Sequence, residues 1–141
     1  MRAIIGCNNL SFIGLGKTGL PWVCKEDLIH FRNLTQNNVL IAGHNTYESV
    51  LSAVKGFVKE NEGISFDMSH NRIVMKDRDS IIIEPNNWII GGKKTYEKYC
   101  HLFTELHISH IDNNNIGDVT FPDLSNLNPE CKIFNYYFKS E

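Results

Sequence analysis

Short apolar runs, each bounded by turn residues, alternate with helix-like patterns along this sequence. The runs predict strands at residues 3–7, 39–42, 72–75, 81–83, 88–90, 106–111 and 132–138. Apolar spacings of three and four residues predict helices at residues 26–34, 46–54 and 93–103. Strands that alternate with helices are typical of an α/β domain, so we expect a central, mostly parallel, twisted sheet with helices on both faces.

Length and charge narrow the class of protein further. The 141 residues fit one domain with its own core, so we predict a single domain over residues 1–141. The formal net charge is −2 with acids and bases interspersed, which gives no basic face for nucleic acid. The first apolar run is interrupted by Asn8 and Asn9 and is too short for a signal peptide or a membrane span. We therefore expect a cytoplasmic protein with neither nucleic-acid nor membrane partners.

Cysteine and histidine spacing does not predict a metal site. The four cysteines are widely spaced, which is typical of reduced thiols rather than a disulfide framework or a C-x-x-C pair. His107 and His110 lie three residues apart in a predicted strand, so their side chains should point to opposite faces. We expect no bound metal.

One acidic residue lies on an apolar helix stripe. Asp27, Phe31 and Leu34 follow the i, i+4, i+7 pattern and should project from one side of the first helix, with Asp27 the one buried acid. Acids are common in the first turn of a helix, where the helix dipole favours them, so a purely structural role is open. The alternative is that a cationic or donor-rich ligand satisfies the carboxylate.

Two strand ends carry residues suited to phosphate. Gly91-Gly92-Lys93 and Gly43-His44-Asn45-Thr46 each connect a predicted strand to a predicted helix. Helix N-termini favour anions, and glycines allow close approach to the backbone, so one extended dinucleotide fits both turns; tight packing turns give the same pattern. The G-x-G-x-x-G fingerprint of the Rossmann fold is missing.

The segment around Gly16-Lys17-Thr18 imitates a phosphate-binding loop, but Ser11 stands where that motif needs glycine. Gly19 and Pro21 follow immediately and would break the required helix. The segment predicts a flexible flap, which is either an active-site lid or an ordinary surface loop.

Taken in order, these segments resemble the dihydrofolate reductase family. The similar segments are A-I-I-G-C, I-G followed by L-P-W, E-D-L-x-x-F, A-G-H-N-T-Y-E-S, I-I-G-G-K-K-T-Y, and H-I-D followed by G-D-V-T-F-P. The similarity is close over residues 3–50 and 88–122. It implies NADPH-dependent reduction of 7,8-dihydrofolate to tetrahydrofolate, with hydride added at pterin C6 and a proton at N5. That activity supports one-carbon and thymidylate metabolism and is an antifolate target.

The resemblance also implies roles for individual residues. Asp27 would pair with the pterin and have a pKa raised by burial, and Ser109 would support it. Trp22 would hold an ordered water, and Tyr96 would lie near the nicotinamide. Gly91 and Gly92 would form a tight peptide, with a cis bond allowed, and the Ile5 and Ile90 carbonyls and the Cys7 backbone would line the site. Substrate-binding residues would be Ile5, Gly6, Cys7, Leu28, Phe31, Ser49, Val50 and Ile90; cofactor-binding residues would be Cys7, Ile13, Gly14, Gly43, His44, Asn45, Thr46, Lys76, Gly91, Gly92, Lys93, Lys94 and Thr95.

The chain departs from the family pattern in places. His44 replaces the basic residue that meets the cofactor's 2′-phosphate, with Lys76 or Arg78 as substitutes, so NADH is an alternative cofactor to NADPH. The antiparallel C-terminal edge expected for this family is curtailed, ending at residues 132–138. We expect a monomer whose open edge permits weak self-association.

Two other functions remain open from the sequence. The fold could carry a non-catalytic folate- or pterin-binding protein, or a reductase acting on a pyrimidine nucleotide precursor. Asp27 disfavours the pyrimidine reductase, because that chemistry does not need a buried acid beneath a pterin.

Overall fold

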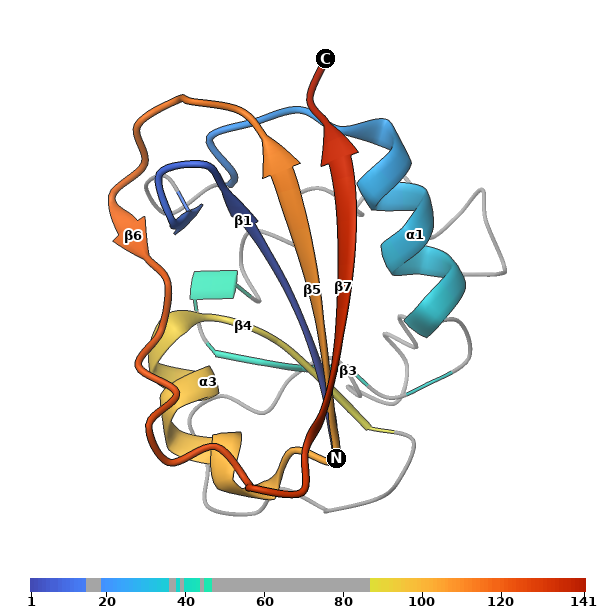
Figure 1. Cartoon of the computed structure of the whole chain (residues 1–141), viewed down its shortest axis with the longest axis vertical. Helices are drawn as coiled ribbons and strands as arrows, with labels where there is room; N and C mark the ends of the chain where they lie inside the picture. The colour runs from blue at the N-terminus through green and yellow to red at the C-terminus, as the bar shows by residue number, and fades with distance from the viewer. Residues whose placement is uncertain (15–18, 36–37, 39, 44, 47–86) are drawn as a thin grey trace.

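The computed structural model describes residues 1–14, 19–35, 38, 40–43, 45–46 and 87–141. Within these residues, five strands form one sheet in the order β3-β4-β1-β5-β7, and every pairing in it is parallel (Figure 1). Its strands are β1 (Arg2–Asn8), β3 (Leu40–Ala42), β4 (Trp88–Gly91), β5 (Glu105–Asp112) and β7 (Lys132–Lys139). A separate antiparallel ribbon joins β2 (Phe12–Gly14) to β6 (Val119–Thr120).

Helices cover both faces of the sheet, as the alternating pattern predicted. The helices are α1 (Lys25–Thr35) and α3 (Lys93–Tyr99), the latter followed by the 3-10 turn η2 (Cys100–Leu102). On the α3 face, the core includes Ile5, Leu106 and Ile108. On the α1 face, Trp22 and Ile111 form a smaller cluster. Figure 1 shows the two helices on opposite sides of the strands. None of the helices in the described part of the chain is both long and apolar enough to cross a membrane.

The apolar runs predicted most of the described elements. The strands expected at 3–7, 88–90, 106–111 and 132–138 and the helices at 26–34 and 93–103 are present, with ends shifted by one or two residues or, at the last helix, a final 3-10 turn. The strand expected at 39–42 is β3. The strands expected at 72–75 and 81–83 lie outside the described residues, as does most of the helix expected at 46–54.

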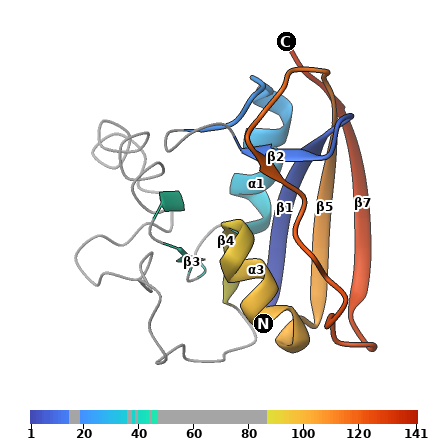
Figure 2. The same cartoon turned by 90° about the vertical axis from the view of Figure 1, so that its left-hand side faces the viewer.

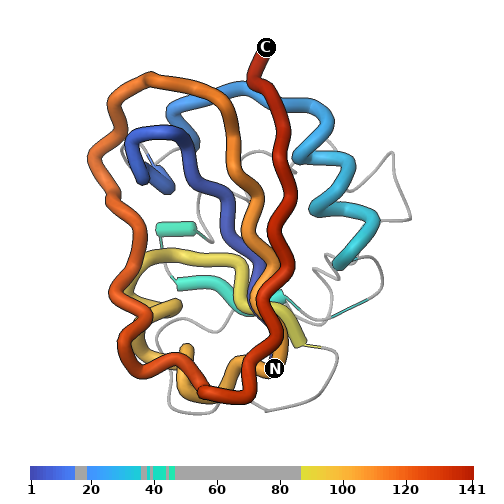
Figure 3. Tube along the Cα trace, viewed as in Figure 1, coloured from blue at the N-terminus to red at the C-terminus, as the bar shows by residue number. Residues whose placement is uncertain are grey.

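The expected antiparallel C-terminal edge is wrong for β7, which pairs with β5 in parallel from Glu105↔Lys132 to Asp112↔Lys139. After β5 the chain runs back along the sheet through β6, as the tube in Figure 3 shows. It then reaches the N-terminal end of β5, where the Lys132 N–H donates to the Thr104 carbonyl at 3.0 Å. A strand that starts from that end must run in the same direction as β5.

β7 forms the outer edge of the described sheet, with β5 between it and β1 (Figure 2). Its Ile133 and Tyr137 side chains are 51% and 77% exposed. β7 is therefore an edge strand of the described sheet, the kind of strand to which a further strand can add.

The sheet divides at its centre. β1 pairs with β5 along its whole length, but it pairs with β4 only at Arg2↔Trp88 and Ala3↔Ile89. Beyond Ala3, the carboxyl halves of β1 and β4 are no longer paired, and we call this region the split. In open α/β sheets, ligands bind beside carboxyl strand ends where neighbouring connections diverge.

Candidate active site

Asp27 lies beside β1 at the start of α1. It is partly buried, and a Cβ atom built on Gly6 would lie 3.6 Å from its Oδ2. Phe31 and Leu34 are also partly buried, which agrees with the predicted stripe. Asp27 is not the one buried acid that we expected, because Glu97 and Glu105 are equally in the partly buried class.

Asp27 nevertheless differs from the other described carboxyl groups in its electrostatics. Burial raises the pKa of its carboxyl, as predicted, and the Ser109 hydroxyl and then His30 oppose that rise. The Ser109 Oγ approaches the carboxylate closely enough to lower its pKa but falls short of a regular hydrogen bond. Asp27 is therefore the described acid whose protonated form the fold favours.

Two buried polar atoms near Asp27 make no regular hydrogen bond to protein within the described ranges: Trp22 Nε1 and Ser109 Oγ. Buried polar groups are normally hydrogen-bonded, so these two atoms suit a polar ligand or an ordered water. The Trp22 ring packs against β1, since a Cβ on Gly6 would lie 3.2 Å from its Cζ2. Asn115, which no sequence pattern singles out, donates from its Nδ2 to the Pro21 carbonyl at 2.8 Å and so fixes the residue before Trp22.

Tyr96 connects α3 to the β1 side of the split. Its hydroxyl is buried and donates to the Ile4 carbonyl at 2.6 Å. Burial raises the Tyr96 pKa far above its usual range, so the hydroxyl stays protonated and acts as a donor. Tyr96 was predicted near the nicotinamide, and the structure places it beside the split.

The backbone prediction for β1 is wrong by one residue. Backbone groups of alternate strand residues point to opposite neighbours. Because the Arg2 N–H donates to the Asn87 carbonyl and Ile4 accepts from Tyr96, the carbonyls of Ile4 and Gly6 face the split. The backbone groups of Ile5 and Cys7 face β5 instead, and the side chains of both are buried in the α3 core.

Five of the predicted cofactor residues meet where β3 and β4 end and α3 begins. The Gly91–Gly92 peptide is cis, as the resemblance allowed, and Gly91 has a φ of +138°. The Gly43 N–H donates to the Gly91 carbonyl at 2.7 Å. A Cβ on Gly91 would lie 2.9 Å from Thr46 Oγ1, and one on Gly43 would lie 2.6 Å from Thr95 Oγ1. The three glycines therefore let the Thr46 and Thr95 side chains pack directly on the backbone where these segments meet.

The other predicted residues lie at more varied places. Lys93 Nζ donates to Thr120 Oγ1 at 2.7 Å, Lys94 is exposed, and Asn45 is exposed in the first helical residues after β3. The Gly14 carbonyl accepts from the Asp118 N–H at 3.0 Å within the β2–β6 ribbon, which also contains Ile13. Leu28 is 55% exposed, and Ile90 is partly buried. His44, Ser49, Val50 and Lys76 lie outside the described residues.

The two β5 histidines point to opposite faces, as predicted. The His107 ring packs on Trp88 and Tyr136, whereas the His110 ring packs on Tyr137. Among the residues that the structure describes, there is no cluster of three or more side chains able to hold a metal ion.

A sequence model described as dihydrofolate reductase matches residues 1–132. The chain belongs to the dihydrofolate reductase family. Dihydrofolate reductase of Buchnera aphidicola subsp. Schizaphis graminum is 30% identical over 132 residues, covering 86% of this chain and 76% of the relative. Dihydrofolate reductase type 1 of Escherichia coli is 30% identical over 128 residues, covering 86% of this chain and 80% of the relative.

A solved dihydrofolate reductase shares the fold. The enzyme of Enterococcus faecalis, complexed with NADP(H) and RAB-propyl, matches with a TM-score of 0.67 at 22% identity. The match covers 88% of this chain and 77% of that one. The dihydrofolate reductase fold is thereby established for this chain, and the roles of its site residues remain predictions.

Proposed function

We propose that this chain is an enzyme that uses NADPH to reduce 7,8-dihydrofolate to tetrahydrofolate, with hydride added at C6 and a proton at N5. The observation that carries the proposal is the Asp27 carboxyl, which is partly buried, has a raised pKa and lies near two buried polar atoms, Trp22 Nε1 and Ser109 Oγ, that make no regular hydrogen bond within the described residues. A carboxyl in such surroundings suits a donor-rich, flat heterocycle such as a pterin.

Asp27 would both orient the pterin and favour its protonation. An ionised carboxylate accepts two hydrogen bonds from a ring nitrogen and an amino group, and a raised pKa keeps its proton available closer to neutral pH. Ser109 and Trp22 would complete the polar side, with the Trp22 N–H holding a water or the ligand. Phe31 lies one helical turn from Asp27 and would pack on the ring system.

The backbone around the split would bind the cofactor. The reduced nicotinamide, when bound, supplies the hydride, so the protein's task is alignment and exclusion of water. The carbonyls of Ile4 and Gly6 face the split, and the flat ring would lie beside the glycine pair at 91–92, on which the Thr46 side chain packs. Lys93 and the start of α3 would favour the pyrophosphate, and NADH remains an alternative to NADPH.

The deciding experiment is a turnover assay that follows NADPH oxidation with and without dihydrofolate. We expect oxidation only with dihydrofolate, and Asp27→Asn should lose most of it at neutral pH while recovering some at low pH, where the substrate carries its own proton. Glu26→Gln is the matched control, because Glu26 is exposed in the same helical turn.

The same assay separates the two alternatives. A folded protein that binds pterin in calorimetry but has no NADPH affinity and no turnover would be a non-catalytic binder. Turnover of a pyrimidine nucleotide precursor in place of dihydrofolate would identify the other reductase class.

The protein would act in the cytoplasm as a monomer, without nucleic-acid or membrane partners. The exposed β7 edge supports weak self-association. Sedimentation velocity should show a concentration-dependent dimer that Tyr137→Lys removes, because Tyr137 is 77% exposed on that strand and a charge there disfavours edge pairing. A single sedimenting species at all concentrations would refute the self-association.

A further inference from the structure

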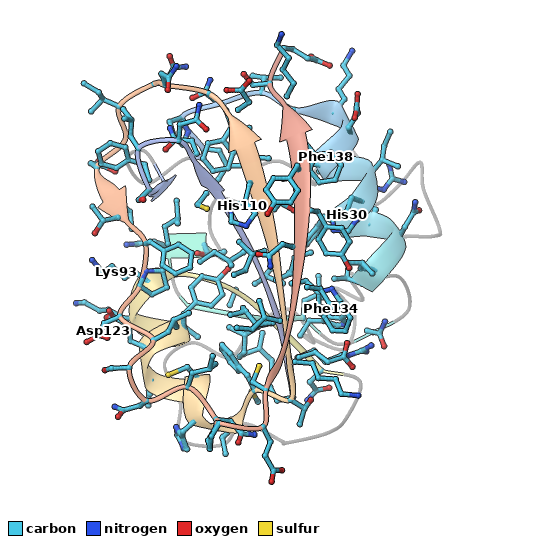
Figure 4. The ribbon with its side chains drawn as sticks, viewed as in Figure 1. His30, Lys93, His110, Asp123, Phe134 and Phe138 are labelled. Carbon is cyan, nitrogen blue, oxygen red and sulfur yellow. The ribbon has the colours of Figure 1, made fainter. Side chains whose placement is uncertain are left out.

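His30 lies between α1 and the outer strand of the sheet. It follows Asp27 by three residues on α1, so the two side chains are neighbours on the helix. Its ring centroid lies 4.1 Å from that of Tyr136 and 5.4 Å from that of Phe138, both on β7. Figure 4 shows His30 extending from α1 toward β7 beside Phe138. The histidine ring therefore packs against the sheet on the same face as Asp27.

Tyr136, on which His30 packs, is itself held by two hydrogen bonds in series. His107 Nε2 lies 2.9 Å from Glu105 Oε1, and His107 Nδ1 lies 2.9 Å from the Tyr136 hydroxyl. Because the carboxylate can only accept, Nε2 carries the proton, and Nδ1 of a neutral ring accepts from Tyr136. This series fixes the Tyr136 ring and gives His30 a rigid surface to pack on.

His30 also interacts electrostatically with Asp27. Burial lowers the pKa of the His30 imidazole, the Asp27 charge raises it again, and His107 lowers it further. Among the described residues, the groups around His30 are Asp27 on its own helix, His107 on β5 with Glu105 behind it, and the neutral Tyr136 and Phe138 on β7. Its Nε2 is buried with no hydrogen-bond partner among the residues that the structure describes. Within the described part of the chain, Asp27 is thus the acid whose charge favours the His30 imidazolium.

We propose that His30 is a positioning residue for Asp27: held against Tyr136, its imidazole shares a coupled proton equilibrium with the Asp27 carboxyl. Coupling between two titrating groups is reciprocal, so a protonated His30 keeps Asp27 ionised, and a neutral His30 lets Asp27 retain its proton to higher pH. His30 thereby sets the pH range in which Asp27 can favour protonation of the substrate. The catalytic consequence rests on the function proposed above, whereas the coupling between His30 and Asp27 does not depend on that function.

The coupling can be measured without turnover. Histidine ring signals of the ligand-free protein are followed by NMR as a function of pH, in the wild type and in Asp27→Asn. The His30 midpoint should fall by about one pH unit in Asp27→Asn, because the charge that favours the imidazolium is gone. Glu26→Gln should leave it unchanged, and the exposed His101 is an internal reference. A His30 midpoint that moves by less than about 0.2 units in Asp27→Asn would overturn the proposal.

The kinetic consequence is tested with His30→Gln, with His101→Gln as the control. The limb of the kcat/KM profile that reports Asp27 should move to higher pH by roughly half a unit or more, since the cation that opposes its protonation is removed. A lower plateau with an unmoved midpoint would mean that His30 has only a structural role. If the wild type shows no turnover, the proposed function fails, and the NMR titration still decides the coupling.

Discussion

A methyl group added at Gly91 tests whether the glycine pair forms the cofactor side of the site. Gly91 has a φ of +138°, a conformation that L side chains rarely adopt. Its Cβ would lie 2.9 Å from Thr46 Oγ1 and 3.2 Å from Thr46 Cγ2. Gly91→Ala therefore introduces backbone strain and an overlap with a neighbouring side chain at once.

The two effects can be given magnitudes. A residue held in a sparsely populated backbone region costs about 1–3 kcal/mol. Overpacking costs about 1–3 kcal/mol where the neighbour cannot move, and less here because Thr46 is only partly buried. We expect Gly91→Ala to lower the free energy of unfolding by about 2–4 kcal/mol, which a domain with about 5–15 kcal/mol of stability survives. The variant should stay folded, so its cofactor affinity can be measured.

Urea unfolding of the ligand-free protein measures the destabilisation, and calorimetry measures the affinity for NADPH. Gly19→Ala is the matched control, because a Cβ there would meet no heavy atom of the described residues within 4 Å. Adding Thr46→Ala to Gly91→Ala should restore the overlap part of the stability but not the backbone part. We expect Gly91→Ala to weaken NADPH binding at least about tenfold. If Gly91→Ala matched Gly19→Ala in both measurements, the glycine pair would not form this side of the site.

Three further predictions follow from single contacts. The raised pKa of Asp27 means that proton binding stabilises the native state; this stabilisation is fully present below the unfolded-state pKa and is lost as the pH rises through the native-state pKa. Because an asparagine cannot ionise, Asp27→Asn should raise the free energy of unfolding by about 1 kcal/mol at pH 7. Urea titrations should show no such gain near pH 3, and an equal gain at both pH values would contradict the argument. Tyr96→Phe should cost about 1–2 kcal/mol in unfolding experiments, since it leaves the buried Ile4 carbonyl without its donor, and an unchanged Tm would exclude this. Lys93→Ala should weaken NADPH binding roughly three- to tenfold and flatten its salt dependence in calorimetry, while Lys132→Ala on the far edge strand should match the wild type.

The strands of the central sheet could be predicted because their apolar runs are long enough to stand out. β2 and β6 could not, since a three-residue and a two-residue strand carry no measurable periodicity. The direction of β7 was also beyond the sequence. Its run of apolar and aromatic residues reads equally well in either direction, and the path of residues 113–131 decides where the strand starts.

The candidate site was predictable where a local pattern carries it. Asp27 stands out because helix periodicity places it on an apolar stripe, and Gly91 stands out because a glycine pair ends a strand. The predicted carbonyl of Ile5 lies one residue beyond Ile4, whose carbonyl faces the split. Side-chain alternation could not show this, because the order of the strands decides which neighbouring strand the Ile4 backbone faces. His30 was missed, although its spacing from Asp27 is a visible signal, because its contact with Tyr136 joins residues far apart in the chain.

The central position of β1 also governs how this protein is made. Both strands that flank β1 in the finished sheet come late in the sequence, β4 beginning at Trp88 and β5 ending at Asp112. Pairings between distant segments form slowly, and a growing polypeptide leaves the ribosome from its N-terminus. A nascent chain that has not reached Trp88 therefore holds its first strand without either flanking strand. Until Trp88 and the residues of β5 have been made, the apolar side chains of β1 lack the neighbouring strands beside which they are buried in the finished sheet.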